Sequence, residues 1–127
     1  MIPYSYRFHG HASLRYVYKN GETRRAQYFH LRYVKNSRRK TPRIAVVVSK
    51  KVYKGAVGRN RIRRRIYELF RHQLPHISGG IDIVCIVTHA GVRIIDTEEL
   101  RTAFESTLLE AGICNTKVKN DIIEGKE

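Results

Sequence analysis

The stretch from Arg43 to Gln73 reads RIAVVVSKKVYKGAVGRNRIRRRIYELFRHQ, and it determines the arrangement expected for the rest of the chain. It opens with a continuous β-branched run over Arg43–Ser49, which is typical of a central strand. A basic loop with two glycines, Lys50–Gly58, comes next. The segment Arg59–Gln73 then places apolar residues at helical spacing, which predicts a helix that Pro75 ends. Its apolar stripe consists of Ile62, Ile66, Leu69 and Phe70.

Shorter patterns on both sides complete the expected fold. Upstream, His11–Asn20 has the spacing of a short helix, and Arg25–Val34 alternates like a half-buried strand. Downstream, the apolar run Ile81–Val87 predicts another strand, and Asp96 with Glu99 resembles the capping box of a last helix. That helix is expected to bury Leu100, Ala103, Phe104, Thr107, Leu108 and Ala111 and to end at Gly112. The order helix, strands, helix, strand, helix predicts a small α+β sandwich.

Length and composition indicate one globular domain. The chain has 127 residues, of which 42% are hydrophobic, so it can build its own core. We expect a single domain over residues 1–127, with an ordered core at about 7–113 and a flexible tail at 114–127. The longest purely apolar run, Ala45–Val48, is too short to span a membrane. The first residues lack the apolar part of a secretory signal, so we expect a cytoplasmic protein with Cys85 and Cys114 as free thiols.

The charge of the chain is strongly positive and unevenly distributed. Lysine and arginine number 25 against 11 aspartates and glutamates, which gives a formal charge of +14. Residues 1–65 carry 19 basic residues and a single acidic one, Glu22, whereas residues 66–127 carry 6 basic and 10 acidic residues. Such an excess is unfavourable in a compact domain unless a polyanion neutralises it. Nucleic acid is the leading partner, and an anionic membrane is less suitable because no amphipathic lysine-rich helix with aromatic anchors is present.

The densest group of cations lies in the loop and helix of the opening stretch. Eight of them fall within sixteen residues: Lys50, Lys51, Lys54, Arg59, Arg61, Arg63, Arg64 and Arg65. Guanidinium and ammonium groups suit phosphates, and the amide of Asn60 suits a base edge or a 2′-hydroxyl. Glu68 is the only acid in helical reach, three residues after Arg65 and four after Arg64, so it cannot neutralise the group. The helical spacing places Asn60, Arg64, Tyr67 and Arg71 on the outer side of this helix, with Arg61, Arg65 and Glu68 beside them.

The string SKK…GAVGRNRIRR resembles the signature of the bacterial ribonuclease P protein component. Arg7-Phe8, the helix ending at Gly21 and the strand beginning at Ile81 are also similar to that family. The resemblance implies an α-β-β-β-α-β-α sandwich with a left-handed crossover, like domain 2 of ribosomal protein S5. It implies that the chain binds the catalytic RNA and precursor tRNA as a non-catalytic subunit. The residues implied to bind the RNA subunit are Lys50, Lys51, Lys54, Arg59, Asn60, Arg61, Arg63 and Arg64.

The family's second site is a cleft for the single-stranded 5′ leader of precursor tRNA. Five positions match it by place or by strand alternation: Leu14, Tyr18, Tyr28, His30 and Arg32. Aromatic rings over a basic floor suit an unpaired strand. Alternatives remain open, since Tyr18 could be a core residue and His30 a solvated strand residue.

Several positions depart from the family pattern. Leu14 stands where phenylalanine is usual, and Arg32 stands where some members have tyrosine. Tyr67 replaces a basic residue, and so does Thr88 or His89 after the strand Ile81–Val87. Each departure weakens the expectation of an RNA contact at that position, and the resemblance to the family does not depend on it.

The sequence offers no cleavage machinery of its own. Metal-dependent hydrolysis needs clustered carboxylates, and the basic half has only Glu22. We therefore expect no metal or cofactor on the protein, magnesium at the RNA subunit, no membrane contact and no obligate protein partner. Rival interpretations are a structural ribosomal RNA-binding protein, a helix-turn-helix DNA binder that reads with Arg59–Gln73, and an independent nuclease. A helix-turn-helix motif needs a short helix where Arg43–Ser49 predicts a strand.

Overall fold

A mixed four-stranded sheet with three α-helices organises the molecule. The computed structural model describes residues 6–8, 11–77 and 79–113. The helices are α1 (Ala12–Asn20), α2 (Ala56–Gln73) and α3 (Thr97–Ala111), with two short 3₁₀ turns, η2 (Leu74–His76) and η3 (Ala90–Arg93). The strands are β1 (Glu22–Arg25), β2 (Phe29–Lys35), β3 (Arg43–Val47) and β4 (Ile81–Val87). The element order is that of the predicted α+β sandwich.

The sheet has the strand order β1-β2-β4-β3. The pairs β1–β2 and β2–β4 are antiparallel, whereas β3 and β4 are parallel neighbours joined by α2. A parallel pair needs such a crossover connection, which places α2 across the sheet. The apolar run Ile81–Val87 becomes the inner strand β4, whose residues are nearly all buried. The run Arg43–Ser49, expected to form a central strand, instead supplies the edge strand β3.

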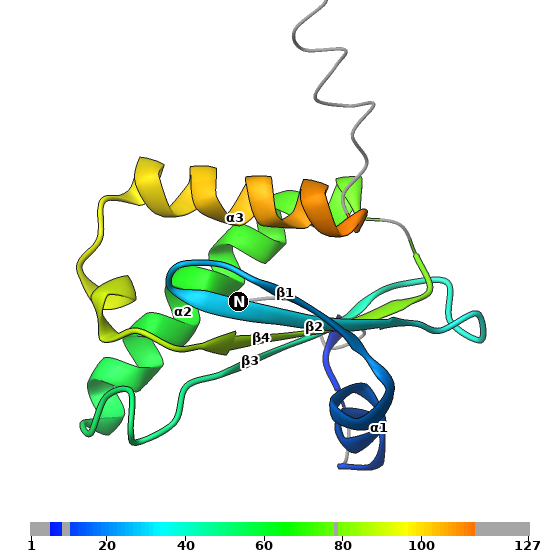
Figure 1. Ribbon diagram of the computed structural model, residues 1–127, viewed down its shortest axis with the longest axis horizontal. Coiled ribbons are helices and arrows are strands. Elements are labelled where there is room, and N and C mark those ends of the chain that lie inside the picture. The colour runs from blue at the N-terminus through cyan, green and yellow to red at the C-terminus, as the bar shows by residue number, and fades with distance from the viewer. Residues whose placement is uncertain (1–5, 9–10, 78, 114–127) are drawn as a thin grey trace, which may run out of the picture.

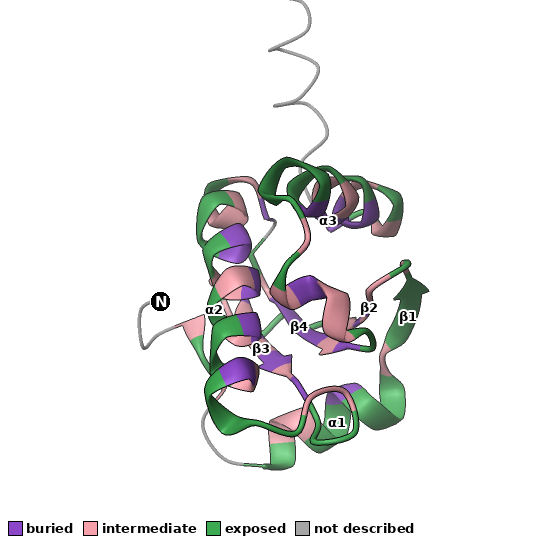
Figure 2. Ribbon diagram, turned by 90° about the vertical axis from the view of Figure 1, so that its left-hand side faces the viewer, coloured by how far each residue is buried: buried purple, intermediate pink, exposed green. Residues whose placement is uncertain are grey.

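The helices divide between the two faces of the sheet. Figure 1 shows α3 above the sheet and α1 below it. One face carries Phe29, Leu31, Ile83 and Cys85, which form the main core with the buried stripe of α2 and with Phe104 of α3. In Figure 2, buried and exposed residues alternate along α2, as expected of a helix with one side on the core. Val17 of α1 and Val84 of β4 are also fully buried but lie outside that cluster.

The structure corrects two predicted boundaries. The segment predicted as one strand, Arg25–Val34, is a hairpin in which β1 ends at Arg25 and β2 begins at Phe29. Helix α2 begins at Ala56, so Gly58 lies inside the helix and not in the preceding loop. A Cβ at position 58 would lie 1.9 Å from the ring of Tyr53, so any larger residue there would displace this ring. This close approach attaches the loop to the first turn of α2.

The predicted ends of α3 are confirmed. The Asp96 carboxylate accepts hydrogen bonds from the backbone N–H groups of Glu98 (3.1 Å) and Glu99 (3.2 Å). The helix ends at Gly112, whose φ of 75° is the left-handed conformation that favours glycine. Of the six residues expected to be buried, Ala103 and Ala111 are only half-buried.

The two cysteines differ in what the structure describes. Cys85 is a free, fully buried thiol, and burial raises its pKa far above the usual value. Such a thiol is unreactive. Cys114 and the tail predicted over residues 114–127 lie outside the described residues. Within the described part of the chain, no helix combines the length and apolar character needed to cross a bilayer.

Candidate nucleic-acid interface

Helix α2 presents its cations to solvent because its opposite side is buried. Ile62, Ile66 and Phe70 are completely buried against the sheet and α3. Arg61 and Arg64 are exposed, and neither guanidinium forms a hydrogen bond or an ion pair among the described residues. The lysines of the preceding loop are exposed in the same way. We call the set Lys50, Lys51, Lys54, Arg61 and Arg64 the basic face.

The other three predicted RNA-subunit contacts have partners within the protein. Arg59 is half-buried and donates hydrogen bonds to the backbone carbonyls of Tyr53 and Lys54. Arg63 donates to the side-chain oxygen of Asn60. Arg59 therefore holds the basic loop against α2, and Asn60 with Arg63 forms a pair on the helix surface.

Arg65, which the helical spacing places beside the outer side, is turned toward the protein. Its guanidinium donates to the carbonyl oxygens of Val92 (2.8 Å) and Ile95 (2.7 Å). It thereby ties α2 to the segment that leads from η3 into α3. This cation is structural, a role that spacing along α2 could not reveal.

Glu68, the acid of α2, does not neutralise the cations of the basic face. Glu68 forms an ion pair with Arg71 at 2.9 Å and does not pair with Arg64 or Arg65. The hydrogen bond from Arg71 lowers the pKa of Glu68. Both side chains are about half exposed, so the pair contributes little to stability. The basic face consequently keeps its full positive charge.

The predicted leader contacts come from α1, from β2 and from the turn before β2. His30 and Arg32 of β2 lie opposite Ile86 and Val84 of β4. They therefore share the face of the sheet opposite to the one that carries Phe29 and Leu31. We call Leu14, Tyr18, Tyr28, His30 and Arg32 the leader surface.

The members of the leader surface differ in exposure. The Tyr18 side chain is 42% exposed, so it is not a core residue. Partial burial raises the pKa of the Tyr18 hydroxyl, and nearby Arg32 opposes that shift. Leu14 and His30 are half-buried. Tyr28 was expected by alternation to share the outer face with His30 and Arg32, but it lies in the hairpin turn, outside β2, and packs against the main core. Its ring meets that of His89 edge-on with centroids 5.5 Å apart.

Arg32 has a structural role that the family pattern did not suggest. Its guanidinium donates hydrogen bonds to the carbonyl oxygens of Tyr18 (2.6 Å) and Gly21 (2.9 Å) and to the Thr23 hydroxyl (2.6 Å). Its Nε is buried without a hydrogen-bond partner in the described structure. The side chain thus satisfies the last carbonyls of α1, where a cation is favoured. These bonds hold α1 on the sheet, and a contact of Arg32 with the leader stays a prediction.

Comparison with known protein families identifies the family to which the chain belongs. The family model described as Ribonuclease P matches residues 2–112, which is most of the chain. The chain belongs to the ribonuclease P protein family. It is therefore the protein subunit of a tRNA-processing endoribonuclease that also contains RNA, and the ribosomal interpretation is not favoured.

Individual relatives agree with this assignment. The chain is 38% identical to the ribonuclease P protein component of Pseudanabaena sp. over 88 residues, which cover 69% of this chain and 76% of that protein. It is 41% identical to the component of Xanthomonas euvesicatoria over 71 residues, which cover 56% of this chain and 48% of that one. The match thus spans about half the length of the Xanthomonas relative.

Solved ribonuclease P proteins have the same fold. The Staphylococcus aureus protein superposes with a TM-score of 0.76 at 29% identity, over 87% of this chain and 98% of that one. The Thermotoga maritima protein superposes with a TM-score of 0.70 at 25% identity, over 79% and 92%.

Two departures from the ribonuclease P family pattern have structural explanations. Tyr67, expected on the outer side of α2, is half-buried against the core, and its hydroxyl accepts a hydrogen bond from the Val46 N–H at 3.3 Å. His89 begins η3, where its Nδ1 accepts a hydrogen bond from the Gly91 N–H at 2.8 Å. Neither side chain replaces the cation usual at its position.

The described residues offer no metal-binding cluster. Across residues 6–8, 11–77 and 79–113, no three histidine, cysteine, aspartate or glutamate side chains are grouped so that they could hold an ion. The carboxylates of α3 have other contacts: Glu98 pairs with Arg101 at 2.9 Å, and Glu105 accepts a hydrogen bond from Gln73 at 3.0 Å.

Proposed function

We propose that this chain promotes tRNA 5′ maturation by binding RNA, while the catalytic chemistry belongs to the RNA subunit. The observation that carries the proposal is the basic face, whose five cations have no acidic partner among the described residues. An exposed cation without an internal partner can exchange its counterions for phosphates. Lys50, Arg61 and Arg64 therefore dock on the catalytic RNA and reduce the repulsion between two polyanions.

The leader surface is proposed to contact the single-stranded 5′ extension of precursor tRNA. Tyr18 is its most suitable stacking residue, because its ring is partly exposed. His30 lies on the sheet face that α1 covers in part, and Tyr28 with His89 extends the aromatic character past the end of β2. Base–aromatic stacking tolerates any sequence, which suits leaders that differ between tRNAs. In this proposal Arg32 acts by holding α1, which carries Tyr18.

Magnesium is proposed to act at the RNA subunit, since the described residues provide no carboxylate cluster for it. A cytoplasmic location is proposed as well, because precursor tRNA is the intended substrate.

Reconstitution tests the division of labour. Protein alone, with any divalent metal, should not cleave precursor tRNA at a specific site. Addition of a bacterial ribonuclease P RNA should give correct 5′ cleavage at low magnesium, because the cations of the protein replace part of the screening by metal ions. Gel analysis of the 5′ product measures both arms. Site-specific cleavage by the purified protein at the rate of the reconstituted particle would overturn the proposal.

A further inference from the structure

A second basic segment connects β2 to β3, at the end of the sheet away from the basic face. Nine consecutive residues, 35–43, contain no acid and include the cations Lys35, Arg38, Arg39, Lys40 and Arg43. In Figure 1 this connection lies at one end of the strands, and the loop before α2 lies at the other. Neither the basic face nor the leader surface includes any of these residues.

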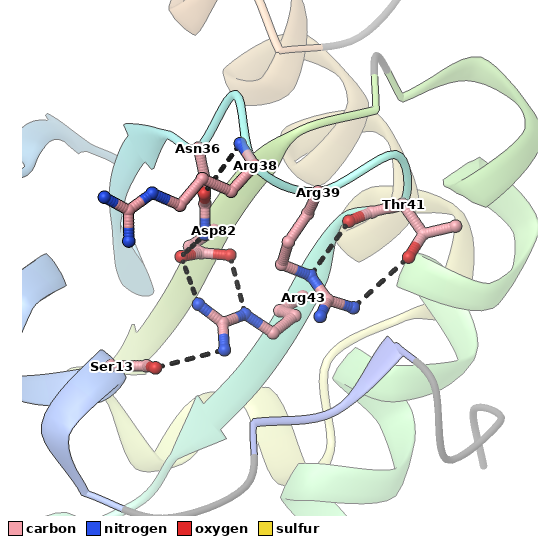
Figure 3. A network of polar contacts seen from close by, with 7 residues as sticks. All are labelled: Ser13, Asn36, Arg38, Arg39, Thr41, Arg43 and Asp82. Atoms are coloured by element: carbon pink, nitrogen blue, oxygen red, sulfur yellow. Dashed lines mark hydrogen bonds and ion pairs between the residues drawn. The ribbon is translucent and has the colours of Figure 1, made fainter.

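A pocket of about 460 Å³ lies between this segment and α1, and we call it the loop pocket. The buried ion pair of Arg43 with Asp82 forms part of its lining, with bonds of 2.9 and 2.8 Å and side chains only 14% and 3% exposed. Asn36 donates to the same carboxylate at 3.1 Å, and Arg43 also donates to the Ser13 hydroxyl at 3.0 Å (Figure 3). The network fixes this wall of the pocket and neutralises Asp82.

Two further cations line the loop pocket without being neutralised. Lys35 and Arg38 are exposed, and neither pairs with an acid in the described part of the chain. Figure 3 shows the guanidinium of Arg38 extending away from Asp82. Arg39 differs, because its guanidinium donates to the carbonyl and hydroxyl of Thr41. The pocket therefore has a net positive charge and suits an anionic group.

The same pocket is lined by an exposed aromatic ring. Tyr16 of α1 is 55% exposed and borders the loop pocket. Tyr16 and Tyr18 are two residues apart, so at about 100° per residue they project from opposite flanks of the helix. Helix α1 thus has the leader surface on the Tyr18 flank and the loop pocket on the Tyr16 flank.

We propose that the loop pocket is a second subsite for single-stranded RNA. Lys35 and Arg38 hold a backbone phosphate, and a base stacks on Tyr16, which is the combination that binds unpaired strands. Along β2, Lys35 is five residues beyond His30, or about 17 Å. A leader that has passed the leader surface must therefore be several nucleotides longer to reach the pocket. This assignment to upstream leader nucleotides rests on the function proposed above.

Binding to the reconstituted particle tests the subsite with two precursor tRNAs, one whose short leader ends at the leader surface and one with a long leader. Tyr16→Ala should weaken binding of the long-leader precursor about fivefold or more, the lower limit for one lost stack. For the same long-leader precursor, log affinity falls with log salt, and the double variant Lys35→Ala/Arg38→Ala should make this slope less steep by about 1.4. Binding of the short-leader precursor should not change. Arg101→Ala, which removes a cation from α3, is the matched control and should affect neither.

Cross-linking identifies the RNA that occupies the pocket. A photoreactive group is attached to Tyr16→Cys in a Cys114→Ser background, since Cys85 is buried. Cross-links to upstream leader nucleotides support the assignment. Cross-links to the RNA subunit, with effects independent of leader length, support a single-strand site but overturn the leader assignment. If Tyr16→Ala and the double variant Lys35→Ala/Arg38→Ala both bind the long-leader precursor as the parent does, and no cross-links form, the proposed subsite is wrong. If Tyr18→Ala also fails to affect leader preference, the leader surface itself is wrong.

Discussion

Arginine side chains in this protein differ in what their guanidinium groups contact, and this decides what each substitution should do. Arg32 and Arg65 donate to backbone carbonyls of other elements, and Arg43 forms a buried ion pair with Asp82. Arg61 and Arg64 are exposed on α2 and contact no acid in the described residues. The first group should affect stability when replaced, and the second should affect RNA binding.

Arg32→Ala should destabilise the protein by about 1.5–3 kcal/mol, the usual value for losing hydrogen bonds to a charged group. The carbonyls of Tyr18 and Gly21 would lose their donor, and α1 would detach more easily from the sheet. Urea unfolding measures the change. Arg25 lies on the neighbouring strand, and its exposed side chain forms no hydrogen bond in the described structure, so Arg25→Ala should stay within about 0.5 kcal/mol of the parent. Equal stability of the two variants would contradict the capping role of Arg32.

Tyr18→Ala should reduce the preference of the particle for leader-bearing tRNA by about 1–3 kcal/mol, the value of one lost stack. Because the ring is 42% exposed, the protein should remain folded. Competition between precursor and mature tRNA measures the preference, and thermal unfolding provides the check on folding. The neighbouring core variant Val17→Ala should instead lower stability, since Val17 is fully buried. Unfolding of Tyr18→Ala would mean that this tyrosine serves packing alone.

At the scale of elements, α2 performs two tasks on different sides. Its buried stripe joins the sheet to α3, and Arg65 adds bonds to the chain between η3 and α3. Its solvent side carries Arg61 and Arg64 of the basic face. Because the two sides do not share residues, the two tasks can be separated by substitution.

Arg65→Ala and Arg61→Ala should give opposite results. Arg65→Ala should lower the free energy of unfolding by about 1–3 kcal/mol, because the Val92 and Ile95 carbonyls lose their donor. Arg61→Ala should leave stability unchanged and flatten the salt dependence of RNA binding by about 0.7–0.9. Paired urea and salt titrations distinguish the variants. A flattened salt slope with normal stability in Arg65→Ala would place that cation on the RNA.

The charge of the whole molecule predicts a steep response to salt. Log affinity for the RNA subunit should fall linearly with log salt, with a slope of about −0.7 to −0.9 per phosphate contacted. With about five contacts, the number of cations in the basic face, a fourfold rise in salt should weaken binding by about 100-fold to 500-fold. Fluorescence titration at several salt concentrations measures the slope. Deletion of residues 114–127, which carry three basic and three acidic residues, should leave it unchanged. Affinity independent of salt would rule out a phosphate-binding role for the basic face.

Local sequence patterns were sufficient to predict most helices and strands, since these elements depend on residues that are neighbours along the chain. The stripe of Ile62 and Ile66, the strand Ile81–Val87 and the ends of α3 are as predicted, because helical and strand periodicity and capping act within a few residues. The place of each strand in the sheet was not predicted correctly, since Arg43–Ser49 was expected to be central and β3 lies at the edge. The turn that divides the segment Arg25–Val34 was not predicted, because its residues, Ala26-Gln27-Tyr28, include no glycine or proline.

Tertiary structure alone decided which cations are free. Arg65 lies 27 and 30 residues from the carbonyls it binds, and Arg43 lies 39 residues from Asp82. No periodicity along the chain links groups so far apart, because only folding brings them together. Glu68 is a local case by contrast, since it had Arg64, Arg65 and Arg71 within helical reach and pairs with Arg71 three residues away. The sequence by itself determined the elements, the excess of positive charge and the family, and the packing of those elements determined which arginines remain available for RNA.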